Sequence, residues 1–314
     1  MIYLAPLQGF TDFVYRKVYA GAFRGIDAFF IPYITVQNEA ILKKYGREIC
    51  PQNNPAGRVV PQILVKDKDE TRFLVQTLKK DGYSEVNLNM GCPYPMVTKR
   101  GRGAGLLPEP GQVYQILDAY FQHAEMALSV KLRAGLDSPE EMEKIVPVLN
   151  EFPLKEVILH PRIARQLYKG ETMDEVVGFV SKNLRHPLVY NGDIFSVNDF
   201  HRRKQQFPFI TNWMLGRGVL MNDFLPAEIN GIRLGEEEKR SVLLHFHQQM
   251  LEEYERSTDN PGNALNKMQQ FWIYFSYHFD TQKKAFKRIK KAKDYHALKT
   301  ETGSIIKNEP LVLQ

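Results

Sequence analysis

The chain has 314 residues, of which 43% are hydrophobic and 25% are charged, with a net charge of +6. This is ordinary globular usage, and no apolar run approaches the roughly 18 residues that cross a membrane. Only two cysteines occur, Cys50 and Cys92, which excludes a disulfide framework and a four-ligand zinc site; no signal peptide is visible at the amino terminus. We therefore expect a monomeric protein of the cytoplasm that requires neither a membrane nor a metal.

Eight short β-branched or aromatic runs recur along the first 215 residues. Most are continuously apolar, as is typical of strands buried on both faces of a parallel sheet. Helical patterns lie between them, so the alternation predicts a (β/α)₈ TIM barrel. The expected strands are Ile2–Pro6, Asp27–Tyr33, Val59–Val65, Glu85–Asn89, Leu128–Arg133, Glu156–His160, Pro187–Tyr190 and Ile210–Leu215. The clearest expected helices are Asp69–Asp81, Gly111–Ala127, Pro139–Glu151, Asp174–Asn183 and Val197–Gln206.

The pattern changes after about residue 235, where strand-like runs stop. Three helices are expected there, at Glu236–Arg256, Asn263–Phe279 and Thr281–Lys293, followed by a loose tail from Glu301 to Gln314. We therefore divide the chain into a catalytic barrel domain, residues 1–235, and a small C-terminal helical domain, residues 236–314.

Positive charge is concentrated in this helical part. Between Thr281 and Lys299 stand eight lysines and arginines, with Asp294 the one carboxylate. Such a block indicates a polyanionic partner. A solvated helix face explains the same charge run equally well.

Polar residues interrupt several of the expected strands. Gln62, Asn87 and Lys131 lie in otherwise apolar runs, where an unpaired polar group is costly. The edge of an aromatic heterocycle would satisfy all three, with Lys131 beside a negatively charged reduced ring. The alternative is an internal salt bridge or water network.

Two glycine-containing segments follow the last two strands. Asn191-Gly192-Asp193 and Gly216-Arg217-Gly218 stand where TIM barrels commonly bind phosphate through backbone N–H groups. Either segment alone would be explained by a tight turn. Together they favour a phosphate-bearing cofactor.

Cys92 directly follows the fourth expected strand and precedes a basic, glycine-rich loop. An unperturbed thiol stays protonated at neutral pH, so Cys92 can serve as a general acid. A nucleophile is less favoured, because no acidic or amide partner for a Cys–His pair is evident. Cys50 is interpreted as structural. His160 ends the sixth strand ahead of Arg162 and Arg165, which suits anion contact or proton transfer.

At this point the motifs resemble those of the tRNA-dihydrouridine synthases, flavoenzymes with an FMN-binding barrel and a helical C-terminal domain. The similarity runs from Ala5 to about Ile229 and is most specific at Asn87-Leu88-Asn89-Met90-Gly91-Cys92-Pro93. The other motifs follow in the family's order: Val130–Gly135, His160-Pro161-Arg162, Asn191–Ile194 and Gly216-Arg217-Gly218.

The resemblance implies that FMN, reduced by NADPH, reduces the C5–C6 bond of a uridine in tRNA. Cys92 would protonate C5 as hydride arrives at C6, and Asn89 would orient the uracil. The implied flavin-ring and ribityl contacts are Pro6, Leu7, Gln62, Lys131 and His160, and the implied phosphate contacts are Asn191, Gly192, Asp193, Gly216 and Arg217. The implied RNA contacts are Arg100, Arg102, Arg162, Arg165 and Tyr168 at the entrance, with Lys287, Arg288 and Lys291 in the helical domain.

Several residues depart from the family's pattern. Asn87 stands where an acidic residue is usual, Leu7 where methionine is usual, and Pro161 where glycine is common, and Arg102 enters a loop usually richer in small residues. These departures concern the subgroup and therefore the uridine that is reduced. The competing interpretations are a synthase acting on rRNA, an FMN barrel oxidoreductase acting on a free pyrimidine, and a noncatalytic RNA-binding protein.

Overall fold

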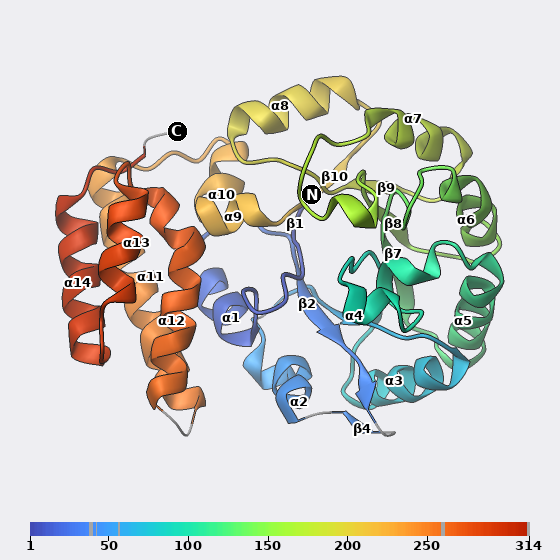
Figure 1. Cartoon of the computed structure of the whole chain (residues 1–314), viewed down its shortest axis with the longest axis horizontal. Coiled ribbons are helices and arrows are strands. Elements are labelled where there is room, and N and C mark those ends of the chain that lie inside the picture. Colours follow the sequence, from blue (N-terminus) through green and yellow to red (C-terminus); the bar gives the residue numbers. More distant parts are fainter. Residues whose placement is uncertain (38–39, 42, 56, 259–260, 313–314) are drawn as a thin grey trace. The chain divides into compact units, whose positions relative to one another are not determined.

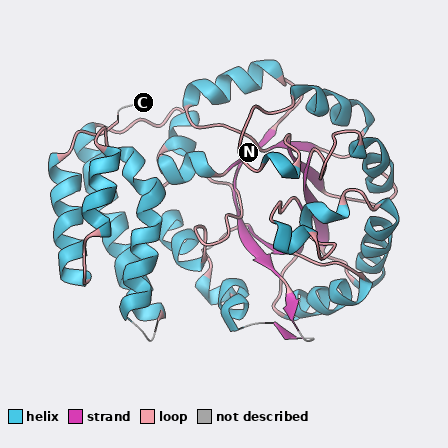
Figure 2. Cartoon of the chain, in the orientation of Figure 1, coloured by secondary structure: helices cyan, strands magenta, loops and turns pink. Residues whose placement is uncertain are grey.

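Eight parallel strands close into a barrel in the computed structural model of the chain, which describes residues 1–37, 40–41, 43–55, 57–258 and 261–312 (Figures 1 and 2). Around the barrel the strands follow the order β1-β10-β9-β8-β7-β6-β5-β2. They are β1 (Ile2–Leu4), β2 (Ala28–Ile34), β5 (Val59–Ile63), β6 (Glu85–Met90), β7 (Ala127–Arg133), β8 (Glu156–His160), β9 (Leu188–Tyr190) and β10 (Asn212–Leu215). The predicted (β/α)₈ barrel is confirmed, and each strand lies within two residues of an expected run. A separate hairpin pairs β3 (Val36–Gln37) with β4 (Ala40–Ile41).

The barrel interior is filled by side chains from most of its strands. Tyr3, Phe30, Val60, Ile158 and Met214 belong to one buried cluster, and none of them is more than 1% exposed. The continuously apolar runs therefore form strands buried on both faces, as their composition predicts. A packed interior also means that ligands have to bind at the ends of the strands.

A network of ion pairs lies at the amino ends of the strands. Arg58 contacts Glu85, the first residue of β6, at 2.7 Å and Glu156, the first residue of β8, at 3.0 Å. The Tyr3 hydroxyl donates to Glu156 at 3.0 Å, and Lys155 pairs with Glu85 at 2.7 Å. Because each of these charged groups is paired with an opposite charge, the network stabilises this end of the barrel.

Two compact units make up the chain. The first comprises Met1–Gln8, Asp27–Gly192 and Phe207–Leu215, and the second comprises Gly9–Ile26, Asp193–Gln206 and Gly216–Gln314. All eight barrel strands belong to the first unit. The expected domain boundary at residue 235 stays a prediction.

Helices of the first unit lie around its strands, except for the short α4, which follows β6 and lies inside their ring (Figure 1). They are α2 (Lys43–Ile49), α3 (Lys68–Lys80), α4 (Pro95–Thr98), α5 (Pro110–His123), α6 (Glu141–Leu149) and α7 (Asp174–Asn183). Asp67 caps α3 by accepting hydrogen bonds from the backbone N–H groups of Asp69 and Glu70. Helix α5 ends four residues before the predicted Ala127, because Ala127 already begins β7.

The second unit is helical. It contains α1 (Phe13–Ala22), α8 (Val197–Gln206), α9 (Arg217–Met221), α10 (Leu225–Ile229), α11 (Glu236–Ser257), α12 (Pro261–Phe275), α13 (Gln282–Lys290) and α14 (Tyr295–Asn308). The predicted C-terminal helical region is therefore present, and α11 to α14 lie side by side (Figure 1).

The prediction of a loose tail from Glu301 is wrong for residues 301–308, which belong to α14. Asp294 caps this helix by accepting a hydrogen bond from the Ala297 N–H at 2.8 Å. Leu298, Ile305 and Ile306 are buried at helical spacing. The stripe is short and contains a threonine, Thr302, which is why its periodicity is weak in the sequence.

Candidate functional site

Amide side chains form a buried chain at the carboxyl ends of β5 and β6. Gln62 donates to Asn87 at 2.7 Å, Asn87 donates to Ser129 at 2.9 Å, and Asn89 donates to Gln62 at 2.6 Å. The register explains these contacts, because Gln62 is the direct neighbour of Asn87, and Asn87 of Ser129. Gln62 and Asn87 are therefore paired within the protein, as the internal-network alternative expects, whereas Lys131 does not belong to this network.

Asn89 links this amide chain to the loop that carries the cysteine. Its Oδ1 accepts hydrogen bonds from the backbone N–H groups of Gly91 at 3.0 Å and Cys92 at 2.9 Å. The amide chain thus fixes the direction in which the backbone leaves β6. Asn89 positions Cys92 in addition to any contact it makes with substrate.

Cys92 lies in a small apolar cluster at the mouth of the barrel. Its side chain packs with Leu64, Val97 and Tyr33 and is 8% exposed. Gly103 closes over it with φ +59°, and a β-carbon there would lie 2.9 Å from Cys92 Cβ. This glycine of the basic loop is therefore required by close approach and backbone conformation.

Burial raises the pKa of the Cys92 thiol, so the thiol is protonated at neutral pH. Opposing effects come from the Tyr94 backbone N–H, the Tyr33 hydroxyl and the charges of Arg133 and Lys131. These four groups stabilise the thiolate, so the loss of a proton from Cys92 is less costly here than burial alone would make it.

Lys131 is a cation without an anionic partner among the described residues. It lies in β7 between Asn89 of β6 and Ile158 of β8 in the strand register. Desolvation, with repulsion from Arg133, lowers the pKa of its ammonium group from 10.5 to about 7. A half-buried lysine in this state favours an anion or a hydrogen-bond acceptor as its ligand.

The next residues around the mouth come from β7, β8 and the loop after β8. The Arg133 guanidinium donates to the carbonyls of Gly91 and Ile163, both at 3.1 Å, and its Cζ lies 5.4 Å from the centre of the Tyr168 ring. His160 is adjacent to Arg133 in register, and its ring centre lies 6.2 Å from that of Tyr168. Arg133, Tyr168 and His160 are thus gathered beside Cys92.

The arginines expected at the entrance have different surroundings. Arg162 is 2% exposed and donates to the Gly170 carbonyl at 2.6 Å, so it shapes its own loop. Arg102 is half-buried and paired with Glu70, and the exposed Arg165 is paired with Asp137. Arg100 is exposed and has no ion pair within the described part of the chain. Of the four, Arg100 has the most freedom to meet a substrate.

The residues predicted to hold phosphate make hydrogen bonds and an ion pair within the protein. In the first unit, Asn191 donates to the Met214 carbonyl at 2.8 Å, and a β-carbon on Gly192 would lie 3.1 Å from Tyr190 Oη. In the second unit, Arg217 pairs with Asp193 at 2.8 Å, and Gly216 caps α9. Pro6 and Leu7 follow β1 and are half-buried.

The predicted RNA contacts of the helical region lie on α13 and at its end. Lys287 and Lys291 are exposed. Arg288 instead donates to Glu301 at 2.7 Å, Ser304 at 3.0 Å and Glu309 at 3.2 Å, so it connects α13 with α14 and the residue after α14.

Sequence reasoning did not assign several residues of this mouth. Arg133 and Tyr33 contact the cysteine loop, and Thr35, just after β2, has a buried hydroxyl with no hydrogen-bond partner among the described residues. Their common signal is position, because each stands at or just after the carboxyl end of a barrel strand.

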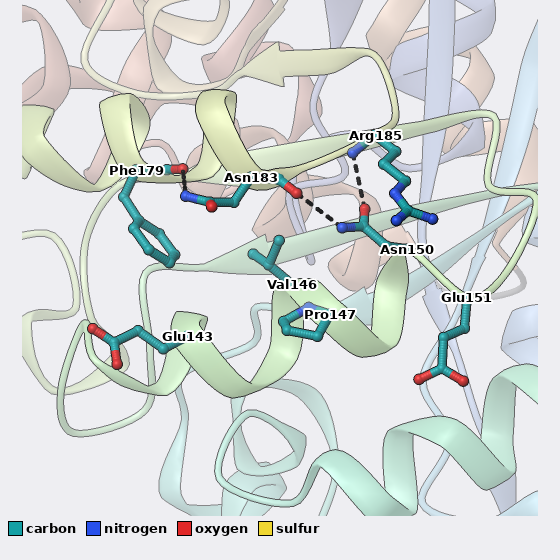
Figure 3. A pocket seen from close by; sticks show the side chains of 8 residues that line it. All are labelled: Glu143, Val146, Pro147, Asn150, Glu151, Phe179, Asn183 and Arg185. Carbon is teal, nitrogen blue, oxygen red and sulfur yellow. Dashed lines mark hydrogen bonds between the residues drawn. The ribbon is translucent and has the colours of Figure 1, made fainter.

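A pocket of about 340 Å³ lies elsewhere, on the outer helices α6 and α7 (Figure 3). Asn150 donates to the Asn183 carbonyl at 2.8 Å and accepts from the Arg185 N–H at 2.9 Å. These groups satisfy one another, and none of the predicted site residues lines the pocket.

Neither a metal-binding cluster nor a membrane-spanning helix occurs in the described ranges. No group of three or more His, Cys, Asp or Glu side chains there is arranged to hold a metal ion. In that same part of the chain, no helix is both long and apolar enough to cross a membrane.

Comparison with known proteins gives a consistent match. A family model described as dihydrouridine synthase matches residues 3–308. The tRNA-dihydrouridine(16) synthases of Escherichia coli (strain K12) and Shigella flexneri are each 29% identical to the chain over 231 residues, which are 70% of this chain and 72% of either relative. That of Aquipseudomonas alcaligenes is 27% identical over 271 residues, 79% of this chain and 83% of the relative.

Among solved structures, morphinone reductase matches with a TM-score of 0.51 at 11% identity, covering 74% of this chain and 86% of that one. A second structure, of a morphinone reductase mutant in complex with tetrahydroNAD, gives a TM-score of 0.50 at 10% identity, covering 73% of this chain and 86% of that one. At these identities the likeness concerns the barrel fold alone.

Proposed function

This chain belongs to the dihydrouridine synthase family, and from that membership and the geometry around Cys92 we propose that it reduces the C5–C6 bond of a uridine in tRNA, with FMN as its cofactor and NADPH as the reductant. The observation that carries the proposal is a protonated, nearly buried thiol beside two cations at the mouth of the barrel. A thiol in that state holds the proton that a general acid has to donate, and the cations stabilise the thiolate that remains.

The residues of the first unit fit an anionic heterocycle. Lys131 lacks an anionic partner in the described part of the chain, and its pKa of about 7 means that a bound anion would restore its charge. We also assign His160, Pro6 and Leu7 to the flavin, together with Gln62, which is buried and bonded to Asn87 and Asn89. When bound, FMN reduced by NADPH would supply the hydride for C6 of the uracil.

The phosphate of the cofactor is assigned to the two glycine-containing segments. We propose that Asn191, Gly192, Asp193, Gly216 and Arg217 hold it through backbone N–H groups and the Arg217 charge. Support comes from the position of both segments directly after the last two barrel strands, where TIM barrels commonly bind phosphate.

The chain's own part in the reaction is to orient the uracil and protonate C5. Asn89 is held by Gln62 and would present its remaining N–H to the uracil. Cys92 would transfer the thiol proton to C5 and later recover a proton from solvent. We propose that the entrance is bordered by the exposed Arg100, Arg165 and Tyr168, and by Arg102 and Arg162, which are paired within the protein. Lys287 and Lys291 would contact RNA phosphates.

The direct test uses the chain's two cysteines as a matched pair. Cys92→Ala should bind flavin normally but reduce uridine at least about 100-fold more slowly, because a positioned general acid contributes about 10²–10⁴-fold. Cys50→Ala, which loses only a hydrogen bond from its thiol to Gln52, should keep full activity. The measurements are flavin absorbance after purification and dihydrouridine formed in unmodified tRNA. Full turnover by Cys92→Ala would contradict the assignment.

A substrate panel tests the polyanion part of the proposal. The wild-type protein should modify folded tRNA and leave free uridine and uracil unreduced, because a free base makes none of the phosphate contacts that supply affinity. Turnover of free uracil would favour the small-molecule oxidoreductase. Turnover of rRNA in place of tRNA would keep the chemistry and change the substrate.

A further inference from the structure

We propose that Tyr94 and Met96, which form an exposed apolar ridge just after Cys92, stack on the unpaired base next to the uridine being reduced. The inference rests on the proposed function and adds a specificity determinant to it. The substrate it implies is a strand of RNA in which the uridine and its neighbour are both unstacked.

The ridge is exposed although its residues are apolar. Tyr94 is 50% exposed and Met96 is 76% exposed, whereas Val97 is 8% exposed and packs against Cys92 and Leu64. One face of this short segment is therefore anchored in the cysteine cluster, and the other is presented to solvent. Large exposed apolar side chains next to a reactive group indicate a ligand surface.

The backbone fixes the ridge relative to the thiol. The Tyr94 carbonyl accepts hydrogen bonds from the N–H groups of Val97 at 2.8 Å and Thr98 at 3.0 Å, and the Cys92 carbonyl accepts one from Ala104 at 3.1 Å. Gly105 fits so closely that a β-carbon there would lie 2.4 Å from the Thr98 carbonyl oxygen. A base that stacks on Tyr94 is thereby held at a set distance from Cys92.

The charges around the ridge favour an RNA strand over an acidic or apolar protein partner. Lys99 and Arg100 are exposed and form no ion pair in the described ranges, while the nearby Arg102 is neutralised by Glu70. No acidic residue occurs between Gly91 and Leu107. An aromatic side chain interleaved with free cations is the combination that binds single-stranded nucleic acid, through base stacking and phosphate contact.

The difference in burial between Cys92 and Tyr94 indicates which base would stack on the ridge. Cys92 is 8% exposed, so the reduced uridine has to enter beyond the rim to reach its sulfur. Tyr94 is half exposed at the rim, two residues away along the chain. The ridge therefore suits the neighbouring nucleotide, which stays outside when the uridine enters.

The test is a double-mutant cycle between protein and RNA. The protein variants are Tyr94→Ala and Tyr94→Phe, and the RNA variants are unmodified tRNA carrying an abasic site on the 5′ or the 3′ side of the reduced uridine. Because stacking contributes about 1–3 kcal/mol per base, Tyr94→Ala should raise KM on intact tRNA at least about fivefold. One of the two abasic substrates should raise the KM of the wild-type enzyme by the same factor. The same abasic substrate should leave the KM of Tyr94→Ala at its value on intact tRNA.

Tyr94→Phe should behave like the wild type, because it keeps the ring. Tyr114→Ala is the matched control, since Tyr114 is 42% exposed on the outer helix α5. Equal losses for Tyr94→Ala on intact and on both abasic substrates would overturn the proposal, as would a fall in kcat with unchanged KM. Failure of the wild-type protein to form any dihydrouridine would instead refute the proposed function.

Discussion

At the scale of single residues, we expect the protonation state of Lys131 to respond to a ligand bound at the barrel mouth. Its neighbours in register are an asparagine and an isoleucine, and Arg133 repels its charge. An ammonium group with a pKa of about 7 is held there at a cost in stability, because the unfolded chain binds its proton up to about pH 10.5. A cost of this kind is common where a charge is kept for binding.

We predict that FMN binds the cofactor-free protein more weakly as the pH rises from 7 to 9, as Lys131 loses its proton. Lys131→Met should bind about tenfold more weakly at pH 7 and lose this pH dependence, whereas Lys182→Met on α7 should change neither. Fluorescence titration of the apoprotein at several pH values measures both. An unaltered pH dependence in Lys131→Met would remove this lysine from the cofactor site.

Lys131→Met should also unfold at a higher temperature than the wild type near pH 7. Between pH 7 and 10.5 the unfolded chain binds the lysine's proton and the folded chain does not, so the stability of the wild type rises with pH in that window. The difference in stability between Lys131→Met and the wild type should therefore shrink as the pH rises.

Several of the site residues could be predicted from single positions, but their partners could not. Gln62, Asn87 and Lys131 stand out as polar residues in apolar strands. That Gln62 and Asn87 pair with each other depends on the register of β5 against β6, which sequence does not specify. Arg133 stands out in the sequence as a polar residue at a strand end, but its role in holding the cysteine loop depends on its contact with the Gly91 carbonyl, which the sequence does not show.

At the scale of elements, helix α13 combines two kinds of basic residue that the sequence does not distinguish. Lys287 and Lys291 are exposed, whereas Arg288 makes three side-chain contacts to α14 and the residue that follows it. The contacts of Arg288 hold α14 in place. An RNA-binding role remains for the lysines.

We predict that Arg288→Ala lowers the free energy of unfolding by about 1–3 kcal/mol, because it removes the hydrogen bonds of the guanidinium to Glu301, Ser304 and Glu309. Lys287→Ala should stay within about 0.5 kcal/mol of the wild type. Thermal unfolding of the two variants in parallel measures the difference. Equal stability of the two variants would show that the Arg288 contacts do not contribute to the free energy of unfolding.

The double variant Lys287→Ala/Lys291→Ala should bind tRNA more weakly and reduce the salt dependence of binding, by a slope of up to about 2. Its stability should be unchanged. Identical affinity at low and high salt would exclude these lysines from the RNA interface.

The elements themselves were predictable to different degrees. The eight strands were predicted within two residues because continuous apolar runs that are bounded by turns and alternate with helical patterns indicate the buried strands of a parallel sheet. Helix α14 was missed because its buried stripe, from Leu298 to Ile306, is interrupted by Thr302, and its stability comes from packing that sequence does not display.

At the scale of the whole molecule, the predictions that the chain is an oxidoreductase of the dihydrouridine synthase family, and that it has a TIM barrel with a helical C-terminal region, are confirmed. The closed barrel holds its polar residues in two groups with different tasks. The amino ends carry the paired network of Arg58, Glu85 and Glu156, and the carboxyl ends carry Cys92 and Lys131. TIM barrels generally carry their functional residues at the carboxyl ends of the strands, which is where we propose that the chemistry of this chain takes place.

The central claim is that the chain forms dihydrouridine in tRNA, and mapping that nucleoside in cells with and without the gene tests it most directly. The account predicts that dihydrouridine disappears from one defined tRNA position and returns when the wild-type gene, but not the Cys92→Ala variant, is restored. An unchanged map in a strain that has no second synthase would contradict the account.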